Sequence, residues 1–283
     1  MAEYCYFSIG FIFIFQKDKM QKTYILNSTK NRTSRIMLPS TNAPHWILPN
    51  WDAPANIHAA MTLRTVGVST GVYDSFNLAT HVGDDTLRVL ENRRLLKERL
   101  MLPNEPVWLE QVHSDIVIDA TRAIGSPRAD ASFADKVGVV CAVMTADCLP
   151  VLICTRDGQK IAAIHAGWKG LLAGIISNTL TALASHDVLV WLGAAIGASC
   201  FEVGADVRAA FVAKSGLFAA GFVQTSADKY LADIYQLARI ELAMRDVHAV
   251  YGGDFCTVTD KERFYSYRRD TQTGRMATLI WRT

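Results

Sequence analysis

The spacing of apolar residues predicts a helix most clearly over residues 85–100. In this segment charged residues separate the apolar side chains of Leu87, Val89, Leu90, Leu95 and Leu96. Apolar positions three and four residues apart lie on one face of a helix, which then packs against a core. Further helices are predicted over residues 170–184, 204–213 and 227–244.

Short apolar runs, many of them rich in β-branched residues, predict strands between these helices. The predicted strands cover residues 107–109, 116–118, 137–144, 149–154, 160–164, 188–192 and 247–251. Strands outnumber the helices between them, and the sequence has neither a strict strand–helix alternation nor an internal repeat. It therefore predicts an α+β fold, a single compact domain of mixed β-sheets covered by helices.

The first 41 residues differ from the rest, so we divide the chain into a poorly defined N-terminal extension, residues 1–41, and a domain over residues 42–283. Residues 4–15 form a charge-free apolar run, YCYFSIGFIFIF. This run is shorter than the roughly 20 residues that span a bilayer, and it lacks the basic start and cleavage site of a signal peptide. We expect a disordered or mis-assigned extension, with a membrane-surface anchor as the alternative.

Composition narrows the class of partner. The formal net charge is +2, from 29 basic and 27 acidic side chains, and no basic block stands out, so we expect no nucleic-acid partner. Six cysteines without a C-x-x-C pair indicate no compact disulfide framework. We therefore expect a reduced, cytoplasmic protein without membrane association, either a monomer or a homodimer. A net charge of +2 is still compatible with small anionic substrates, because a local charge in a pocket does not show in the net sum.

Three potential metal ligands stand at the edges of apolar runs, where a strand would give way to a loop. They are His113, Cys148 and His165. Two imidazoles and one thiolate form the ligand set of a catalytic zinc with one open position, and active sites are often assembled at such loops. Taken singly, each has a simpler explanation, a hydrogen-bonded histidine or a buried thiol. The prediction of a metal site depends on the three together.

A glycine-flanked turn, residues 167–170, follows His165 and enters a predicted helix. Free backbone N–H groups at a helix start suit a phosphate, and Lys169 would add a positive charge. The alternative is an ordinary strand–helix turn with a solvated lysine, and these residues alone favour it.

Other candidate residues lie in the first third and near the end of the chain. Asn77 and His81 precede the helix at residues 85–100, where a capping aspartate explains part of the polar stretch; His81 has the pKa of a general acid or base. Arg268 lies in the run YSYRR. Such a run either stacks a base and holds phosphate or forms a salt-bridged surface.

At these residues the chain resembles the family once called the multicopper polyphenol oxidase or laccase-domain family. The family is now more often described as purine nucleoside phosphorylases with adenosine deaminase activity. The matching runs, which follow the family's order, are NLATHVGDD (77–85), WLEQVH (108–113), TADCLPVL (145–152), HAGWKG (165–170), FEVG (201–204), YGGDFCT (251–257) and SYRRDTQTGR (266–275).

The resemblance implies that His113, Cys148 and His165 bind zinc, with copper as the alternative, and that Arg64, Asn77 and His81 line the pocket. It also implies central β-sheets covered by helices. The chain departs from the family's pattern in places. Lys169 stands where an arginine is usual, which weakens a bidentate hold on phosphate. Val66 replaces a glycine, and the first forty residues have no counterpart.

On this basis we expect a zinc-dependent purine nucleoside phosphorylase with adenosine deaminase and methylthioadenosine phosphorylase activity, whose partners are a small-molecule nucleoside and phosphate. The expected catalytic residues are His81, Asn77 and Cys148. The expected substrate or phosphate ligands are Arg64, Lys169 and Arg268.

Three alternatives come from other functional classes. One is an amide hydrolase that edits a peptidoglycan precursor, and another is a scaffold with a structural zinc, which an open three-ligand set disfavours. The third is a copper-dependent polyphenol oxidase. Seven histidines are too few to build a multicopper site, although a single copper could oxidise phenols slowly.

Overall fold

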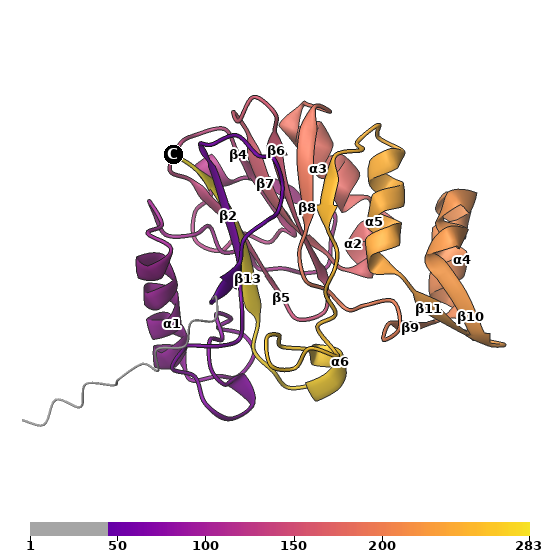
Figure 1. Ribbon diagram of the computed structural model, residues 1–283, viewed down its shortest axis with the longest axis horizontal. Helices are drawn as coiled ribbons and strands as arrows, with labels where there is room; N and C mark the ends of the chain where they lie inside the picture. Colours follow the sequence, from indigo (N-terminus) through magenta and orange to yellow (C-terminus); the bar gives the residue numbers. More distant parts are fainter. Residues whose placement is uncertain (1–44) are drawn as a thin grey trace, which may run out of the picture. The chain divides into compact units, whose positions relative to one another are not determined.

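Two β-sheets pack face to face, and helices cover the outer face of each. A computed structural model describes residues 45–283, which belong to one compact unit, Thr41–Thr283. Figure 1 shows the layers in order from left to right: helix α1, the four-stranded sheet, the six-stranded sheet and the helices α2, α3 and α5. This arrangement confirms the predicted α+β class with mixed sheets.

The four-stranded sheet is antiparallel and runs in the order β1-β2-β13-β5. Its strands are β1 (Trp46–Ile47), β2 (Ile57–Thr62), β13 (Met276–Arg282) and β5 (Val140–Thr145). Strands β5 and β13 are buried along their whole length, because one face meets the six-stranded sheet and the other meets α1. Strands buried on both faces appear in a sequence as continuous apolar runs.

The six-stranded sheet is mixed and runs in the order β12-β8-β6-β7-β4-β3. Its strands are β12 (Val250–Gly252), β8 (Val188–Leu192), β6 (Leu149–Thr155), β7 (Ile161–Ala166), β4 (Ala131–Ala134) and β3 (Val117–Asp119). The outermost pair at each edge is parallel and the central pairs are antiparallel. The central hairpin of β6 and β7 brings together two of the predicted metal ligands.

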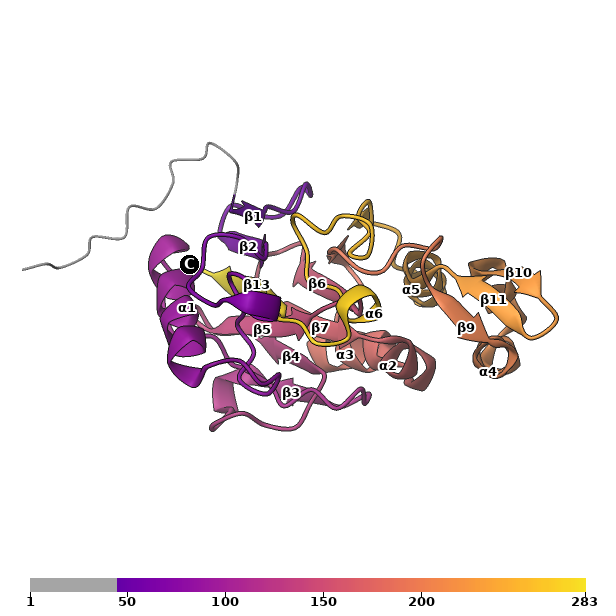
Figure 2. The same cartoon turned by 90° about the horizontal axis from the view of Figure 1, so that it is seen from below.

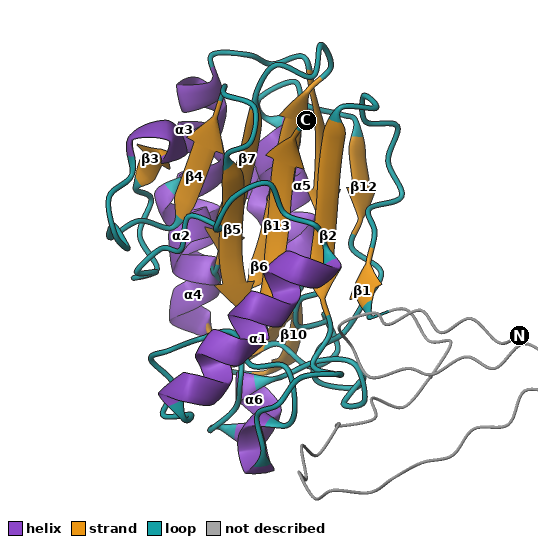
Figure 3. Cartoon of the chain, turned by 90° about the vertical axis from the view of Figure 1, so that its left-hand side faces the viewer, coloured by secondary structure: helices purple, strands orange, loops and turns teal. Residues whose placement is uncertain are grey.

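Helix α1 (Thr86–Arg99) lies across β5, β13 and β2 (Figure 3). The carboxylate of Asp85 caps it by accepting the N–H groups of the next turn, as the sequence predicts. The buried face differs from the predicted one, since Leu87 and Leu90 are exposed. The helix buries Asn92 instead, whose side-chain amide donates to oxygens of the loop at residues 69–77.

The opposite side of the molecule is covered by α2 (Trp168–Ala173), α3 (Ile175–Leu183) and α5 (Ile234–Ala243). A single helix was expected over residues 170–184, but Gly174 adopts φ 99° and divides it into α2 and α3. That left-handed conformation is one that glycine adopts without strain. Short 3₁₀ turns cover Gly71–Tyr73, Ala120–Arg122 and Gly216–Gly221, and a four-residue helix, α6, covers Tyr267–Asp270.

A small three-stranded sheet lies beside α5 together with α4 (Ala205–Lys214), as Figure 2 shows. Its strands are β9 (Glu202–Gly204), β10 (Phe222–Ser226) and β11 (Lys229–Ala232), in the order β10-β11-β9. Residues 227–244 were predicted as one helix, and the first part of that prediction is wrong. Lys229–Ala232 pairs on both sides as β11, and the helix begins only after Asp233, whose side chain caps it.

Other boundaries also differ from the sequence prediction. Val107 forms only an isolated bridge to Cys141, and the strand predicted from residue 137 starts at Val140 because Gly138 turns the chain at φ 83°. None of the helices within residues 45–283 is long and apolar enough to cross a membrane. The apolar run at residues 4–15 lies outside the described residues.

Candidate metal centre and its pocket

The three predicted metal ligands converge at one end of the central hairpin. Pairing of β6 with β7 sets Leu149 opposite Ala166, so Cys148, just before β6, lies beside His165 near the end of β7. His113 reaches them from the loop before β3. One ligand atom from each lies within 4.8 Å of the others, and Cys148 Sγ is 3.7 Å from His113 Nε2. The structure thus forms the predicted group, which has the composition of a metal site.

The buried carboxylate of Asp130 holds this group in place. It accepts the N–H of His113 at 3.0 Å and the N–H of Ser114 at 2.6 Å, and so fixes a turn in which His113 has φ 61°. A histidine in the left-handed region is unusual and needs such support. The same carboxylate accepts the Nδ1–H of His165 at 2.7 Å, so that Nε2 of this ring is the atom left for a metal.

Sequence reasoning missed Asp130. A carboxylate that orients a ligating histidine is a common companion of metal sites and raises the basicity of the ligand. The one signal for it was an aspartate among small residues, in the run RADAS (128–132), where it directly precedes β4. Burial opposes its charge, but the hydrogen bonds from His165 and Ser114 hold the pKa of Asp130 down to about 2.

Cys148 and His165, the two ligands at the hairpin, shift each other's pKa. Burial opposes ionisation of Cys148, but the imidazoles of His165 and His113 lower the pKa of the thiol to about 6. Burial likewise opposes a charge on His165, but Cys148 and Asp130 raise its pKa to about 9. The thiolate is the form that binds metals. By contrast, burial raises the pKa of Cys154 to about 12.

Space beside the ligands is kept by Gly167. A Cβ at this position would stand 3.0 Å from His113 Cδ2 and 3.1 Å from Cys148 Sγ, closer than side chains normally pack. The donor set, its ionised thiolate and this clearance together fit a bound metal ion.

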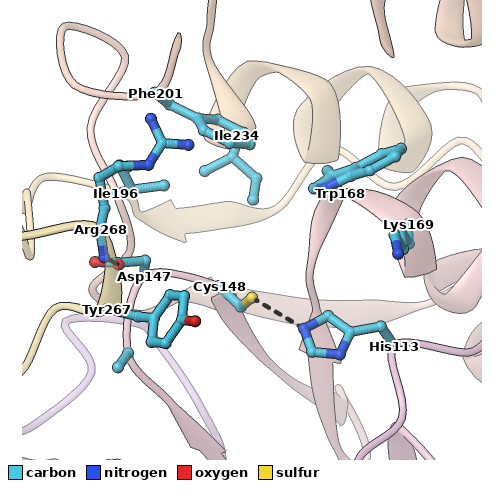
Figure 4. A pocket seen from close by; sticks show the side chains of 11 residues that line it. His113, Asp147, Cys148, Trp168, Lys169, Ile196, Phe201, Ile234, Tyr267 and Arg268 are labelled. Carbon is cyan, nitrogen blue, oxygen red and sulfur yellow. Dashed lines mark hydrogen bonds between the residues drawn. The ribbon is translucent and has the colours of Figure 1, made fainter. Parts of the chain in front are cut away.

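Two cavities open from the metal centre and share His113, Ala146, Cys148 and Tyr267 in their walls. The first holds about 330 Å³. Figure 4 shows Phe201, Ile234 and Trp168 on one side of it and Tyr267, Cys148 and His113 on the other. The second holds about 370 Å³ and is lined additionally by His81, Gln111, His165 and Arg275.

The remaining predicted residues fall into three places. Lys169 and Arg268 line the first cavity, and His81 lines the second. Burial lowers the pKa of His81, and the charges of Arg275 and Arg93 lower it further. The catalytic and binding roles of all three stay predictions.

Arg64 and Asn77 lie away from these cavities. The guanidinium of Arg64 lines a separate surface hollow and donates to the carbonyls of Asp74 and Lys261. Asn77 is fully buried, and its side-chain amide is hydrogen-bonded to Ala79, Asp84 and the N–H of Arg275. Its geometry is that of a residue that positions Arg275.

The sequence from residue 58 to residue 283 matches the family model described as multi-copper polyphenol oxidoreductase laccase. The chain belongs to this family. It is 52% identical over 238 residues to "Purine nucleoside phosphorylase YfiH" of Escherichia coli (strain K12), a match that covers 83% of this chain and 98% of that protein. It is 50% identical over 241 residues to a purine nucleoside phosphorylase of Pseudomonas aeruginosa, with the same coverage.

Two similar solved structures agree with the fold. A Neisseria meningitidis protein of the DUF152 family superposes with a TM-score of 0.82 at 47% identity, covering 84% of this chain and 99% of that one. YlmD from Geobacillus stearothermophilus superposes with a TM-score of 0.79 at 30% identity, covering 86% and 97%. The resemblance predicted from the motifs is therefore confirmed.

Proposed function

We propose that this family member is a zinc-dependent purine nucleoside phosphorylase that also deaminates adenosine and phosphorolyses methylthioadenosine. The observation that carries the proposal is an open three-ligand centre between two cavities, one walled by apolar and aromatic side chains and one by His81 and Arg275. Relatives about 50% identical are named purine nucleoside phosphorylases. The free thiols of the described cysteines support action in the reducing cytoplasm.

His113, Cys148 and His165 would hold the zinc ion, and three protein ligands leave one coordination position open. When bound, the ion would act as a Lewis acid and lower the pKa of water at that position. Within residues 45–283 this is the one cluster of three histidine, cysteine or acidic side chains that could hold a metal. A multicopper centre needs several such clusters, so the geometry favours a single-metal enzyme, with copper as the alternative metal.

The side chains around the centre suit a purine nucleoside. Trp168 and Phe201 offer flat aromatic surface for a base, with apolar Ile234 beside them. Lys169 and Arg268 place positive charge in the same cavity. The lowered pKa of His81 keeps its ring neutral near pH 7, where a neutral imidazole accepts or returns a proton. Water attack at C6 and departure of the base both require such a proton transfer.

Product analysis tests the proposal. Purified zinc-loaded protein should release adenine and ribose 1-phosphate from adenosine when phosphate is present, and inosine when it is absent. Cys148→Ala should lose both activities and the bound zinc, whereas Cys200→Ala, a half-buried cysteine outside the metal cluster, should keep them. Turnover of a UDP-linked muramyl amino acid in place of adenosine would favour the peptidoglycan hydrolase. Phenol oxidation by the copper form alone would favour the oxidase.

A further inference from the structure

Arg275 brings a positive charge into the second cavity without a carboxylate in direct contact with it. It lines this cavity together with His81 and all three metal ligands. None of the ion pairs found among residues 45–283 includes it. A partly buried guanidinium outside any ion pair is costly. Burial lowers the pKa of Arg275, although the charges of Cys148 and Asp147 act in the opposite direction.

The framework behind Arg275 is rigid. Its N–H donates to the side-chain oxygen of the buried Asn77 at 3.0 Å, and β13 starts at the next residue. Gly274 precedes it, where a Cβ would stand 2.7 Å from the ring of Tyr265 and 2.9 Å from Cβ of Asn77. The guanidinium also lies over the ring of Tyr267, 5.9 Å from its centroid. A site on such a base is preorganised for a ligand.

The hydrogen bonds of Arg275 leave one edge of its guanidinium for a ligand. Nη1 donates to the carbonyls of Thr273 and Gly274 at 2.9 and 3.0 Å, and Nε and Nη2 donate to no acceptor in the part of the chain described here. This edge presents two parallel N–H groups, the arrangement that binds two oxygens of a phosphate or carboxylate.

The other candidate arginines each have at least one nitrogen of this edge engaged by a backbone carbonyl. In Arg64, Nε and Nη2 both donate to the carbonyl of Asp74, at 3.0 and 2.9 Å. In Arg268, both terminal nitrogens donate to the carbonyl of Glu202 at 3.3 Å. Lys169 offers only a point charge, in the first cavity. The negative groups that act on Arg275 are Cys148 and Asp147, and the carboxylate oxygens of Asp147 already accept from Thr257 and the N–H of Arg268.

We propose that Arg275 forms an oxyanion subsite beside the metal centre and holds inorganic phosphate there, a role expected from the sequence for Arg64, Lys169 and Arg268. The assignment rests on the proposed phosphorylase function, because phosphate is its second substrate. It also divides the pocket: the base lies against the apolar wall of the first cavity, and phosphate lies in the second, next to His81.

Direct binding of inorganic phosphate tests the subsite without any nucleoside. Isothermal titration calorimetry of the zinc-loaded protein should show binding of inorganic phosphate. Arg275→Gln should weaken this affinity about ten- to a hundredfold, because charge-assisted hydrogen bonds are lost. Arg275→Lys should keep part of the affinity because the charge remains. The matched control Arg122→Gln removes an arginine that is 86% exposed and should leave affinity unchanged. Circular dichroism checks that each variant is folded.

Kinetics provide the second test. Arg275→Gln should raise the KM for phosphate by a similar factor while deamination without phosphate is retained, measured near pH 8, where a histidine of ordinary pKa, about 6.5, is neutral. Unchanged phosphate affinity in Arg275→Gln, or its loss in Arg64→Gln instead, would overturn the subsite. Absence of phosphate binding by the unmodified protein would overturn it as well. Phosphate binding that depends on Arg275 without nucleoside turnover would support the subsite and refute the phosphorylase.

Discussion

Asp130 shows how much of the metal centre depends on a single side chain. Its carboxylate orients one ligand through the backbone, at His113, and another through the ring nitrogen, at His165. Both hydrogen bonds are donated to an oxygen that is wholly shielded from water, where charge-assisted hydrogen bonds are strong. Groups of the protein itself therefore orient two of the three ligand residues.

The ionised thiol gives a prediction for the metal-free protein. After zinc is removed with a chelator, iodoacetamide should modify Cys148 at a rate that rises with pH through about 6 and is constant above it. The reason is that the thiolate is the nucleophile and the pKa of Cys148 is lowered to about 6. Mass spectrometry of the labelled peptide measures the rate.

Cys141 is the internal control, because burial raises its pKa to about 12 and it should stay unlabelled in the same samples. A midpoint for Cys148 near the ordinary thiol value of about 8.5 would show that the two histidines do not stabilise the thiolate. Zinc added before the reagent should protect Cys148.

The metal ligands and some cavity residues were predictable from sequence, whereas Asp130 and Arg275 were not. His113, Cys148 and His165 each stand next to an apolar run, and the three together, rather than any one of them, indicate a metal. Asp130 reaches His165 only because β4 pairs with β7, and Arg275 reaches the cavity only because β13 enters the other sheet. Arg64 was expected in the pocket from the family resemblance, but it donates to the carbonyls of Asp74 and Lys261, away from both cavities.

At the scale of elements, the residue before α2, Gly167, lies directly against the side chains of His113 and Cys148. Gly167→Ala should therefore displace His113 or Cys148 and weaken zinc binding, while the fold is kept, because the backbone at Gly167 has φ −65°, which alanine also adopts. Competition with a zinc-binding dye measures the affinity, and thermal unfolding of the metal-free protein measures stability.

Gly216→Ala is the control for this substitution, because a Cβ there would meet nothing within 4 Å. It should leave zinc affinity unchanged. Equal zinc affinity in both variants would mean that the ligands shift freely and that the clearance at Gly167 has no role in the centre.

A second prediction concerns the ion pair that joins the end of α4 to α5. Lys214 Nζ is 2.8 Å from the carboxylate of Glu241, which is 3% exposed and also accepts from Ser177. Lys214→Met would leave this carboxylate without its cation, so the free energy of unfolding should fall by about 1.5–3 kcal/mol. Urea denaturation measures the change.

The exposed pair of Lys229 and Glu202, 3.5 Å apart, is the comparison. Lys229→Met should change the free energy of unfolding by at most about 1 kcal/mol. Similar losses in both variants would argue against a special role for the buried pair.

Helices and strands were predicted well where one hydrophobic pattern dominated a segment. They were predicted poorly where pairing with other strands determined the structure. Residues 188–192 form a continuous apolar run and became β8. Residues 229–232, KYLA, have no strand signal of their own, and they are a strand because β9 and β10 pair on either side. Pairings between distant segments are not visible in local spacing.

At the scale of the whole molecule, the N-terminal extension is expected to be dispensable. The family model begins at residue 58, and relatives about half identical match this chain over nearly their whole length while covering 83% of it. A chain that begins at Met37 should therefore fold and keep full activity. Solubility, melting temperature and turnover of adenosine measure this, and loss of any of them would assign the extension a part in the domain.

The position of β13 between β2 and β5 has a consequence for synthesis. The N–H of Ala277 donates to the hydroxyl of Thr62 across 215 residues of chain. At about 5–20 residues per second, roughly ten to forty seconds separate the emergence of β2 from that of its main partner. Through that interval the nascent chain carries open strand edges, which invite pairing with other chains. We expect it to depend on a ribosome-associated chaperone until the last strand arrives.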